Sequence, residues 1–421
     1  MPIGSKQQQY IVFILKAAIA SFITYLCMYA YRKPFTAAAF DGISFMGIDY
    51  KILLIISQLI GYTLSKYLGI KIISELKYIN RTKMLVGLMI TAMLMLLLFA
   101  VVPAPYNFPF MFLNGIPLGM IWGVVFGYLE GRRATELLGA IMASSFIISS
   151  GIVKGSGKFL LDNYHVSDMW MPFLTALLFT PVLLIGVYLL HKLTPPTAED
   201  ISERTERIPM TGLERKMFIR KFGISIVVTV FIYVALTMFR DLRDNFAVEF
   251  WQELSADNIP GLLITSELPV AFAVLLVISL MIFIKNNRFA FYFNLLLVML
   301  SGLLMIVFTS LYFNQSISAL SWMILSGFAL YLPYLIYHTV LYERWIAFFK
   351  FKSNAGFLMY LSDAFGYLGS TAILLIRNFA TPNISWVNFL TYTSLCLGGL
   401  LFSLSLFLFF YFKKKSPKLA I

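Results

Sequence analysis

The sequence predicts an all-α polytopic membrane protein with twelve transmembrane helices in two pseudo-symmetric six-helix bundles. Of its 421 residues, 60% are hydrophobic and only 13% are charged, which is more apolar surface than a soluble domain of this size can bury. Apolar runs of about 20 residues, long enough to cross a hydrocarbon core, recur along the whole chain. A single long polar stretch separates the runs into two groups of six. The predicted domains are therefore residues 1–192, a cytoplasmic linker at 193–220, and residues 221–421.

Every span is predicted to be a helix, because a chain in lipid must satisfy its own backbone hydrogen bonds. The period-two alternation of a transmembrane β-barrel is weak in these runs. In chain order, we expect the spans near 10–32, 50–76, 84–103, 108–130, 137–161, 169–191, 221–246, 259–284, 288–313, 317–342, 354–377 and 388–412.

The net charge of +13 comes from basic residues that gather in alternate loops beside the spans. Cytoplasmic loops carry this excess of Lys and Arg, so both termini and the linker are predicted to be cytoplasmic. The charge therefore indicates a lipid bilayer rather than a nucleic-acid partner. We expect a multi-pass protein of a bacterial inner membrane, acting as a monomer.

The cysteines and histidines do not predict a disulfide, a metal site or a cofactor. Cys27 and Cys396 both fall inside predicted spans, which makes a structural disulfide framework improbable. The three histidines are too scattered in sequence for a metal-ligand motif; they are His165, His191 and His338. No metalloprotease or nucleophile-elbow motif is present either, so we expect no enzymatic activity.

Arg32 ends the first apolar run, where a charge is expensive and is usually kept for a function. It follows Tyr25 and Tyr29 at helical spacing, so the three side chains are predicted to share one face. Arginine presents a planar fork that suits phosphate or carboxylate, and the tyrosine hydroxyls can add donors. The alternative is that Arg32 reaches outward to the lipid headgroups.

Two more cations occupy comparable places. Lys66 lies deep in the second span, where it is harder to extend to the headgroups; its alternative role is a cytoplasmic-side anchor. Arg240 in the seventh span repeats the placement of Arg32 in the second half. Its alternative role is a helix-end ion pair with Asp244, four residues on. Arg243 is predicted to line an outer vestibule.

The halves echo each other beyond these arginines. Leu113-Asn-Gly115 in the fourth span corresponds to Leu325-Ser-Gly327 in the tenth. Such a repeat is typical of carriers whose halves rock about a central site. Small residues also recur every four positions in the fourth span, at Gly119, Gly123 and Gly127, and predict a seam of close helix packing.

Two acids, Glu267 and Asp363, lie about 12–14 Å along their predicted helices, too deep for a short side chain to reach the headgroups. They are predicted to pair with the substrate-binding arginines or to carry protons; a static pair between helices is the remaining reading. Asp363 shares a helical face with Tyr360, which we predict to reach the substrate.

Lys154 is predicted to line the path from the fifth span, although it can also be structural. Tyr331, Tyr334 and His338 share one face of the tenth span. Such an aromatic stripe is more often packing than ligand contact, but Tyr331 is retained as a candidate substrate contact.

Four stretches resemble the major facilitator superfamily and, within it, the organophosphate:phosphate antiporters. They are Arg32-Lys33-Pro34-Phe35, 61–69 (Gly-Tyr-Thr-Leu-Ser-Lys-Tyr-Leu-Gly), 327–333 (Gly-Phe-Ala-Leu-Tyr-Leu-Pro), and 355–357 with 365–369 (Ala-Gly-Phe and Phe-Gly-Tyr-Leu-Gly). The resemblance implies the major facilitator fold. It also implies that Arg32, Lys66 and Arg240 bind a phosphoryl group.

The favoured function is a secondary active transporter that moves a small anionic solute, an organic phosphate or similar, by alternating access. The alternative is a proton-coupled symporter of a carboxylate, a peptide-like molecule or a lipid, motivated by Asp363 and Glu267. A transporter-like sensor is the third reading.

Overall fold

A computed structural model describes residues 5–74, 76, 80–129, 132, 134–195, 212–281, 283–284, 286–349, 355–380 and 383–419. Within them, eleven helices are long and apolar enough to cross a membrane, and Leu361–Leu375 is a shorter apolar helix. Contacts divide the chain into two compact units, Met1–Arg204 with Leu254–Thr265, and Thr205–Glu253 with Ser266–Ile421. The predicted linker at 193–220 is described only at its two ends.

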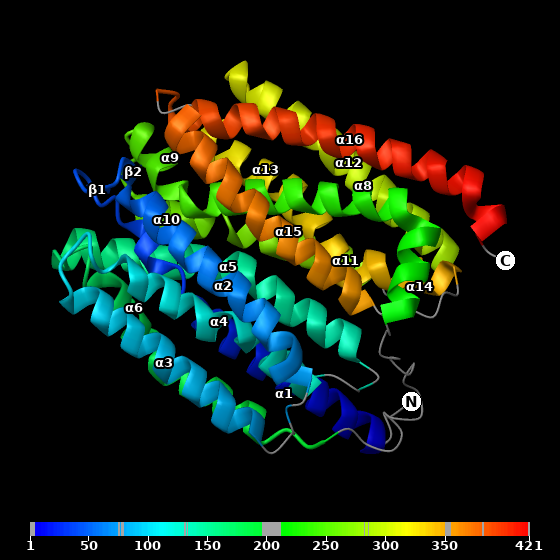
Figure 1. Ribbon diagram of the computed structural model, residues 1–421, viewed down its shortest axis with the longest axis horizontal. Coiled ribbons are helices and arrows are strands. Elements are labelled where there is room, and N and C mark those ends of the chain that lie inside the picture. Colours follow the sequence, from blue (N-terminus) through cyan, green and yellow to red (C-terminus); the bar gives the residue numbers. More distant parts are fainter. Residues whose placement is uncertain are drawn as a thin grey trace. The chain divides into compact units, whose positions relative to one another are not determined.

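The first unit consists of long helices joined by short connections (Figure 1). Their bounds are α1 (Ser5–Ala30), α2 (Tyr50–Ser74), α3 (Arg81–Val101), α4 (Phe108–Leu129), α5 (Thr135–Tyr164) and α6 (Met171–His191), with the 3-10 turn η1 (Pro34–Ala37) and strands β1 (Ser44–Phe45) and β2 (Ile48–Asp49). The short helix α10 (Ile259–Thr265) packs on α5 and completes this unit.

The second unit has more interruptions in its helices. Its elements are α8 (Gly212–Asn245), α9 (Ala247–Glu253), α11 (Leu268–Met281), α12 (Asn287–Phe313), α13 (Ala319–Ile336), the π-helical turn η3 (Tyr337–Leu341), α14 (Tyr342–Phe349), α15 (Ala355–Leu375), the π-helical turn η4 (Ile376–Ala380) and α16 (Trp386–Leu419).

The two units repeat the same pattern of helix packing. In the first, α1 packs on α5 and α6, and both α2 and α3 pack on α4. In the second, α8 packs on α15 and α16, and both α11 and α12 pack on α13. Gly115 and Gly327, which correspond in sequence, therefore lie on helices with equivalent neighbours, α4 and α13.

The first connection contains a small hairpin that the helical prediction did not include. β1 and β2 pair antiparallel, with Phe45 opposite Ile48. The two turn residues, Met46 and Gly47, both have positive φ, of 52° and 77°. Two positive φ values are the requirement of the type I′ turn that joins such short hairpins.

The predicted eighth span at 259–284 corresponds to an apolar span at Ile259–Met281, but its helix is interrupted. The helix breaks between Thr265 and Leu268, so that α10 belongs to the first unit and α11 to the second. Pro269 lies four residues after Thr265, cannot donate a hydrogen bond to that carbonyl, and crowds it with its ring. The break leaves Glu267 between the two helices.

Glycines bring α2 and α4 into backbone contact. A Cβ atom on Gly61 would lie 2.0 Å from the carbonyl oxygen of Phe112, and one on Gly115 would lie 2.4 Å from that of Gln58. A Cβ on Gly119, a residue of the predicted seam, would lie 2.6 Å from the Cβ of Ser65. Small residues at these positions allow the close approach that membrane helices use for packing.

Gly61→Ala is expected to destabilise the protein, because the new methyl group meets main chain that cannot rotate away. Overpacking of this kind costs about 1–3 kcal/mol. Gly87→Ala in α3 is the matched control, since nothing lies within 4 Å of its would-be Cβ; it should leave stability unchanged or raise it slightly. Thermal unfolding of the purified variants in detergent measures both, and equal unfolding temperatures would contradict the packing argument.

Candidate functional site

Arg32 lies in the turn that follows α1, not inside the helix as the predicted span had it. α1 ends at Ala30, and the main-chain N–H groups of Arg32 and Lys33 both donate to the carbonyl of Tyr29, at 3.0 and 2.9 Å. The Arg32 side chain is nevertheless only 4% exposed. The arginine therefore starts a tight connection and stays buried in its unit.

A polar node formed by Gln58 and Asn114 holds this turn. The Gln58 amide donates to the main-chain carbonyl of Arg32, at 3.0 Å, and to the Asn114 side-chain oxygen, at 2.9 Å. The Asn114 amide donates in turn to the carbonyls of Ala92 and Tyr31, at 3.1 and 3.3 Å. These hydrogen bonds join α2, α3, α4 and the turn after α1 through two buried amide side chains. The network therefore orients the backbone that carries Arg32.

Arg32 and Lys66 lie against the same aromatic ring. The guanidinium carbon of Arg32 is 4.0 Å from the centroid of the Tyr62 ring, and the Lys66 ammonium is 5.3 Å from it. Lys66 also lies 5.8 Å from the Trp122 ring on α4. Both distances to Tyr62 are within the range of cation–π attraction. The first unit thus brings together two of the predicted site cations.

The other predicted residues of the first unit are buried nearby or on a neighbouring helix. Tyr29 is 5.8 Å from the Arg32 guanidinium and packs edge-to-face on Tyr25, with centroids 5.7 Å apart. Tyr25 therefore supports Tyr29. Lys154 is 2% exposed on α5, and its proposed contact with the transport path stays a prediction.

In the second unit, Arg240 is held by an acid on its own helix. Its guanidinium donates to Asp241 Oδ1, at 2.7 and 3.0 Å, so its ion-pair partner here is the next residue rather than Asp244. The Ser370 hydroxyl donates to the other Asp241 oxygen at 2.7 Å. Arg240 also donates to the Tyr334 hydroxyl and lies 4.6 Å from that ring.

Arg243 does not line a vestibule as predicted; it is one of the largest fully buried side chains. Its guanidinium pairs with Glu267 at 3.0 Å, and the two side chains are 2% and 9% exposed. Gly327 leaves room for it, because a Cβ there would lie 2.4 Å from an Arg243 nitrogen. The expectation failed because the break in the eighth span places Glu267 beside Arg243.

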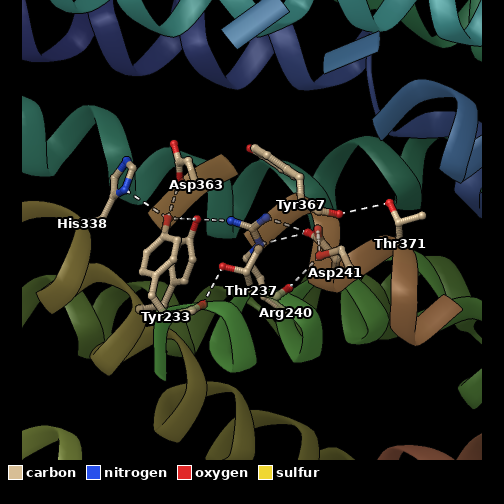
Figure 2. A network of polar contacts seen from close by, with 10 residues as sticks. Tyr233, Thr237, Arg240, Asp241, His338, Asp363, Tyr367 and Thr371 are labelled. Carbon is tan, nitrogen blue, oxygen red and sulfur yellow. Dashed lines mark hydrogen bonds and ion pairs between the residues drawn. The ribbon is translucent and has the colours of Figure 1, made fainter. Parts of the chain in front are cut away.

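Asp363 belongs to a network of hydroxyls that reaches Arg240 (Figure 2). The Tyr233 hydroxyl donates to Asp363 at 2.6 Å and lies 3.2 Å from the Tyr334 hydroxyl and 3.4 Å from Nδ1 of His338. The rings of Tyr233 and Tyr334 stack, with centroids 5.4 Å apart. Asp363 and Arg240 are therefore joined through two tyrosines rather than directly.

Two tyrosines, Tyr331 and Tyr360, remain among the predicted substrate contacts. Tyr331 is buried and lies 5.8 Å from the Arg243 guanidinium. It accompanies the Arg243–Glu267 pair rather than Arg240. The side chain of Tyr360 lies outside the described residues. Among the described residues, no group of three or more His, Cys, Asp or Glu side chains is arranged to hold a metal ion.

Sequence reasoning missed several residues that organise the site. Tyr62 precedes Lys66 by one helical turn, a spacing that indicates contact on a helix surface, but its contact with Arg32 crosses from one segment to another. Gln58 and Asn114 gave no signal beyond being polar in a span. Tyr334 and His338 were interpreted as packing, whereas Tyr334 receives a hydrogen bond from Arg240.

Several solved transporter structures share this fold. The nucleoside transporter NupG superposes with a TM-score of 0.63 at 15% identity, covering 96% of this chain and 99% of that one. A D-xylose-proton symporter gives 0.64 at 13% identity, with 94% and 97% covered. A bacterial homologue of the human peptide transporters PepT1 and PepT2 gives 0.64 at 10% identity, with 97% and 99% covered.

The twelve-span prediction is thereby confirmed: this is a multi-pass integral membrane protein with the major facilitator fold. The chain belongs to the family described as "Family of unknown function (DUF5690)", whose model matches residues 34–415. No curated protein matches the sequence significantly.

Proposed function

We propose that this protein is a secondary active transporter that moves a small organic phosphate, or a similar anion, by alternating access. The observation that carries the proposal is the placement of Arg32 and Lys66 on one Tyr62 ring in the first unit. Two cations that lie against one ring repel each other, and an anion bound to both would offset that repulsion.

The chemistry of the two cations favours a phosphoryl group. Arginine can bind two oxygens at once with its planar fork, while lysine adds a mobile point charge. Both also match positions that the organophosphate:phosphate antiporters use in the motifs that this sequence resembles. Tyr29 and Tyr62 would line the same pocket through their rings, and Tyr25 would support Tyr29.

Arg240 is proposed as the cation of the second unit. Its ion pair with Asp241 means that an anion must compete for the guanidinium or share it. A bound anion would thus loosen a contact that exists without it, which is one way for substrate to change the relative free energies of two states. In major-facilitator carriers the two halves rock around such a site.

Exchange of radiolabelled phosphate in proteoliposomes tests the proposal. Vesicles loaded with inorganic phosphate or phosphorylated metabolites are expected to take up external labelled phosphate faster than empty vesicles. Phosphorylated competitors should inhibit more strongly than carboxylated or neutral ones of equal size. Uptake driven by neutral sugars or nucleosides, with no effect of any phosphorylated compound, would exclude anion transport.

The second candidate is a proton-coupled symporter of a non-phosphate substrate. Asp363 favours it, because this acid is hydrogen-bonded to Tyr233 in a network that also contains His338. One similar solved structure is named a proton symporter. Uptake that follows an imposed pH gradient, without inhibition by phosphorylated solutes, would favour this candidate over the first.

A further inference from the structure

Two aromatic rings on α4 form a parallel stack. The ring centroids of Trp122 and Phe126, one helical turn apart, lie 4.8 Å from each other, and the ring planes differ by 8°. Gly139 on α5 leaves space for Phe126, because a Cβ atom there would lie 3.1 Å from Cε2 of that ring. Offset parallel rings attract each other, so the pair is held in one orientation by its own packing and by α5.

The stacked pair continues the cation site of the first unit. The Lys66 ammonium lies 5.8 Å from the centroid of the Trp122 ring and 5.3 Å from that of the Tyr62 ring. The Arg32 guanidinium lies 4.0 Å from the same Tyr62 ring. Lys66 therefore contacts both the aromatic partner of Arg32 and the stacked pair, and a solute bound to the two cations would have the α4 rings beside it.

The accessible part of the pair does not resemble a lipid-facing surface. Trp122 and Phe126 are half-buried, and every residue from 114 to 129 on α4 is either buried or half-buried. On α3, by contrast, Ile90 and Leu94 are 56% and 50% exposed, as expected of side chains that meet lipid. Lys66 is half-buried about 12 Å before the end of α2, and charged side chains at such depth almost always face away from hydrocarbon. The rings and the ammonium are therefore placed to meet a solute.

The two rings favour one kind of organic group beside the phosphoryl group. A planar aromatic ring can stack face to face on a tryptophan or phenylalanine. Stacking of one base on an aromatic side chain strengthens binding about five- to 150-fold. A saturated ring or a polyol chain has no π-face and gains only non-directional apolar contact there.

We propose that Trp122 and Phe126 bind a planar aromatic or heteroaromatic ring of the solute whose phosphoryl group is held by Arg32 and Lys66. The substrate class is accordingly a phosphate monoester that carries such a ring, in preference to a phosphorylated polyol. This inference rests on the proposed function, because binding of the phosphoryl group to the two cations is what brings the ring to α4.

A matched pair of esters tests the inference by direct binding. Phenyl phosphate and cyclohexyl phosphate carry the same phosphoryl group on rings of equal carbon number, but only the phenyl ring is planar and aromatic. Isothermal titration calorimetry of the full-length protein in lipid nanodiscs should give phenyl phosphate at least about fivefold higher affinity. Glycerol phosphate should bind no more tightly than cyclohexyl phosphate.

Two variants of α4 keep an apolar side chain but remove a ring face. In Trp122→Leu and Phe126→Leu, the ratio of the affinities for phenyl and cyclohexyl phosphate should fall towards one. A partly unfolded sample lowers the amount of active protein but leaves this ratio unchanged. Trp170→Leu is the matched control: Trp170 also packs on a phenylalanine, Phe173, at 6.1 Å, but it is 40% exposed just before α6. Its ratio should equal that of the wild type.

The outcomes distinguish this inference from the proposed function. Equal affinities of the wild type for the two esters, or a ratio unchanged in both α4 variants, would overturn the aromatic site and leave phosphate transport in place. Benzyl alcohol probes the ring without a phosphoryl group. If it bound in a Trp122-dependent way while no phosphate ester bound, the proposed function would be rejected and a ring-binding site on α4 retained. Binding of none of the four compounds would reject both.

Discussion

Glu267→Gln is expected to lower the free energy of unfolding by about 3–5 kcal/mol, because it leaves a buried guanidinium without its carboxylate. Arg243 and Glu267 pair at 3.0 Å with side chains 2% and 9% exposed. The Arg243 side chain has little room in which to find water, since it fills the space beside Gly327. Denaturant unfolding in mixed micelles, with one probe in the helices and another in the tryptophans, measures the loss.

A partly exposed ion pair of the first unit supplies the matched control. Lys158 and Asp162 lie 2.9 Å apart with side chains 14% and 42% exposed, and such pairs contribute about 0–1 kcal/mol. Asp162→Asn makes the same carboxyl-to-amide change and should have almost no effect. Similar losses in the two variants would show that burial of Glu267 does not determine its contribution.

A double variant distinguishes the destabilisation caused by one unpaired buried charge from the net contribution of the ion pair to stability. Replacing both Arg243 and Glu267 with apolar residues, as Arg243→Met with Glu267→Leu, should restore much of the stability that Glu267→Gln loses. Buried ion pairs can often be exchanged for well-packed apolar residues without net loss. A double variant less stable than Glu267→Gln would indicate that the pair itself stabilises the break between α10 and α11.

Substitution at Arg32 or Lys66 is expected to weaken phosphate binding roughly ten- to a hundredfold. Each removes charge-assisted hydrogen bonds that contribute about 1.5–3 kcal/mol, and about 1.4 kcal/mol corresponds to a tenfold change in affinity. The Arg32→Lys variant should also bind phosphate weakly, because lysine keeps the charge but lacks the planar guanidinium that binds two oxygens. Thermal stabilisation by increasing phosphate concentration measures the affinities, since a ligand that binds the folded state raises its stability.

The fold around Arg32 should survive these changes. Gln58 binds the main-chain carbonyl of Arg32, so a side-chain substitution keeps that anchor. Lys192→Gln is the matched control for Lys66→Gln: Lys192 also lies over a tyrosine ring, 5.4 Å from Tyr188, but is exposed at the end of α6. If Lys192→Gln lost as much phosphate affinity as Lys66→Gln, the loss would reflect the overall charge of the protein rather than a binding site at Lys66.

The spanning helices could be predicted from hydropathy, because a chain that crosses lipid must satisfy its backbone hydrogen bonds internally. The residues at which the helices end were harder to predict. The sequence predicted that the first span reaches residue 32, whereas α1 ends at Ala30. That difference moves Arg32 from a helix face into a turn, where the carbonyl of Tyr29 and the amide of Gln58 orient it. A local pattern cannot foresee a partner from a distant segment.

Charge pairing was the least predictable part of the site. Helical spacing offered Asp244 as the alternative, ion-pair partner of Arg240, but the pair forms with Asp241, whose second oxygen accepts a hydrogen bond from Ser370 on α15. Glu267 and Asp363 were both recognised as buried acids. Their different partners, an arginine and a tyrosine, depend on how α11 and α15 pack.

The sequence by itself determined the membrane class, the two groups of spans and the cations worth examining. Long apolar runs, and single charges within or beside them, can be recognised from neighbouring residues alone. Only the tertiary structure decided that Arg32 and Lys66 meet on Tyr62 and that Arg243 is buried with Glu267. It also decided that Asp363 reaches Arg240 through two hydroxyls. These contacts join residues far apart in sequence, and they form because glycines and a helix break let particular helices approach closely.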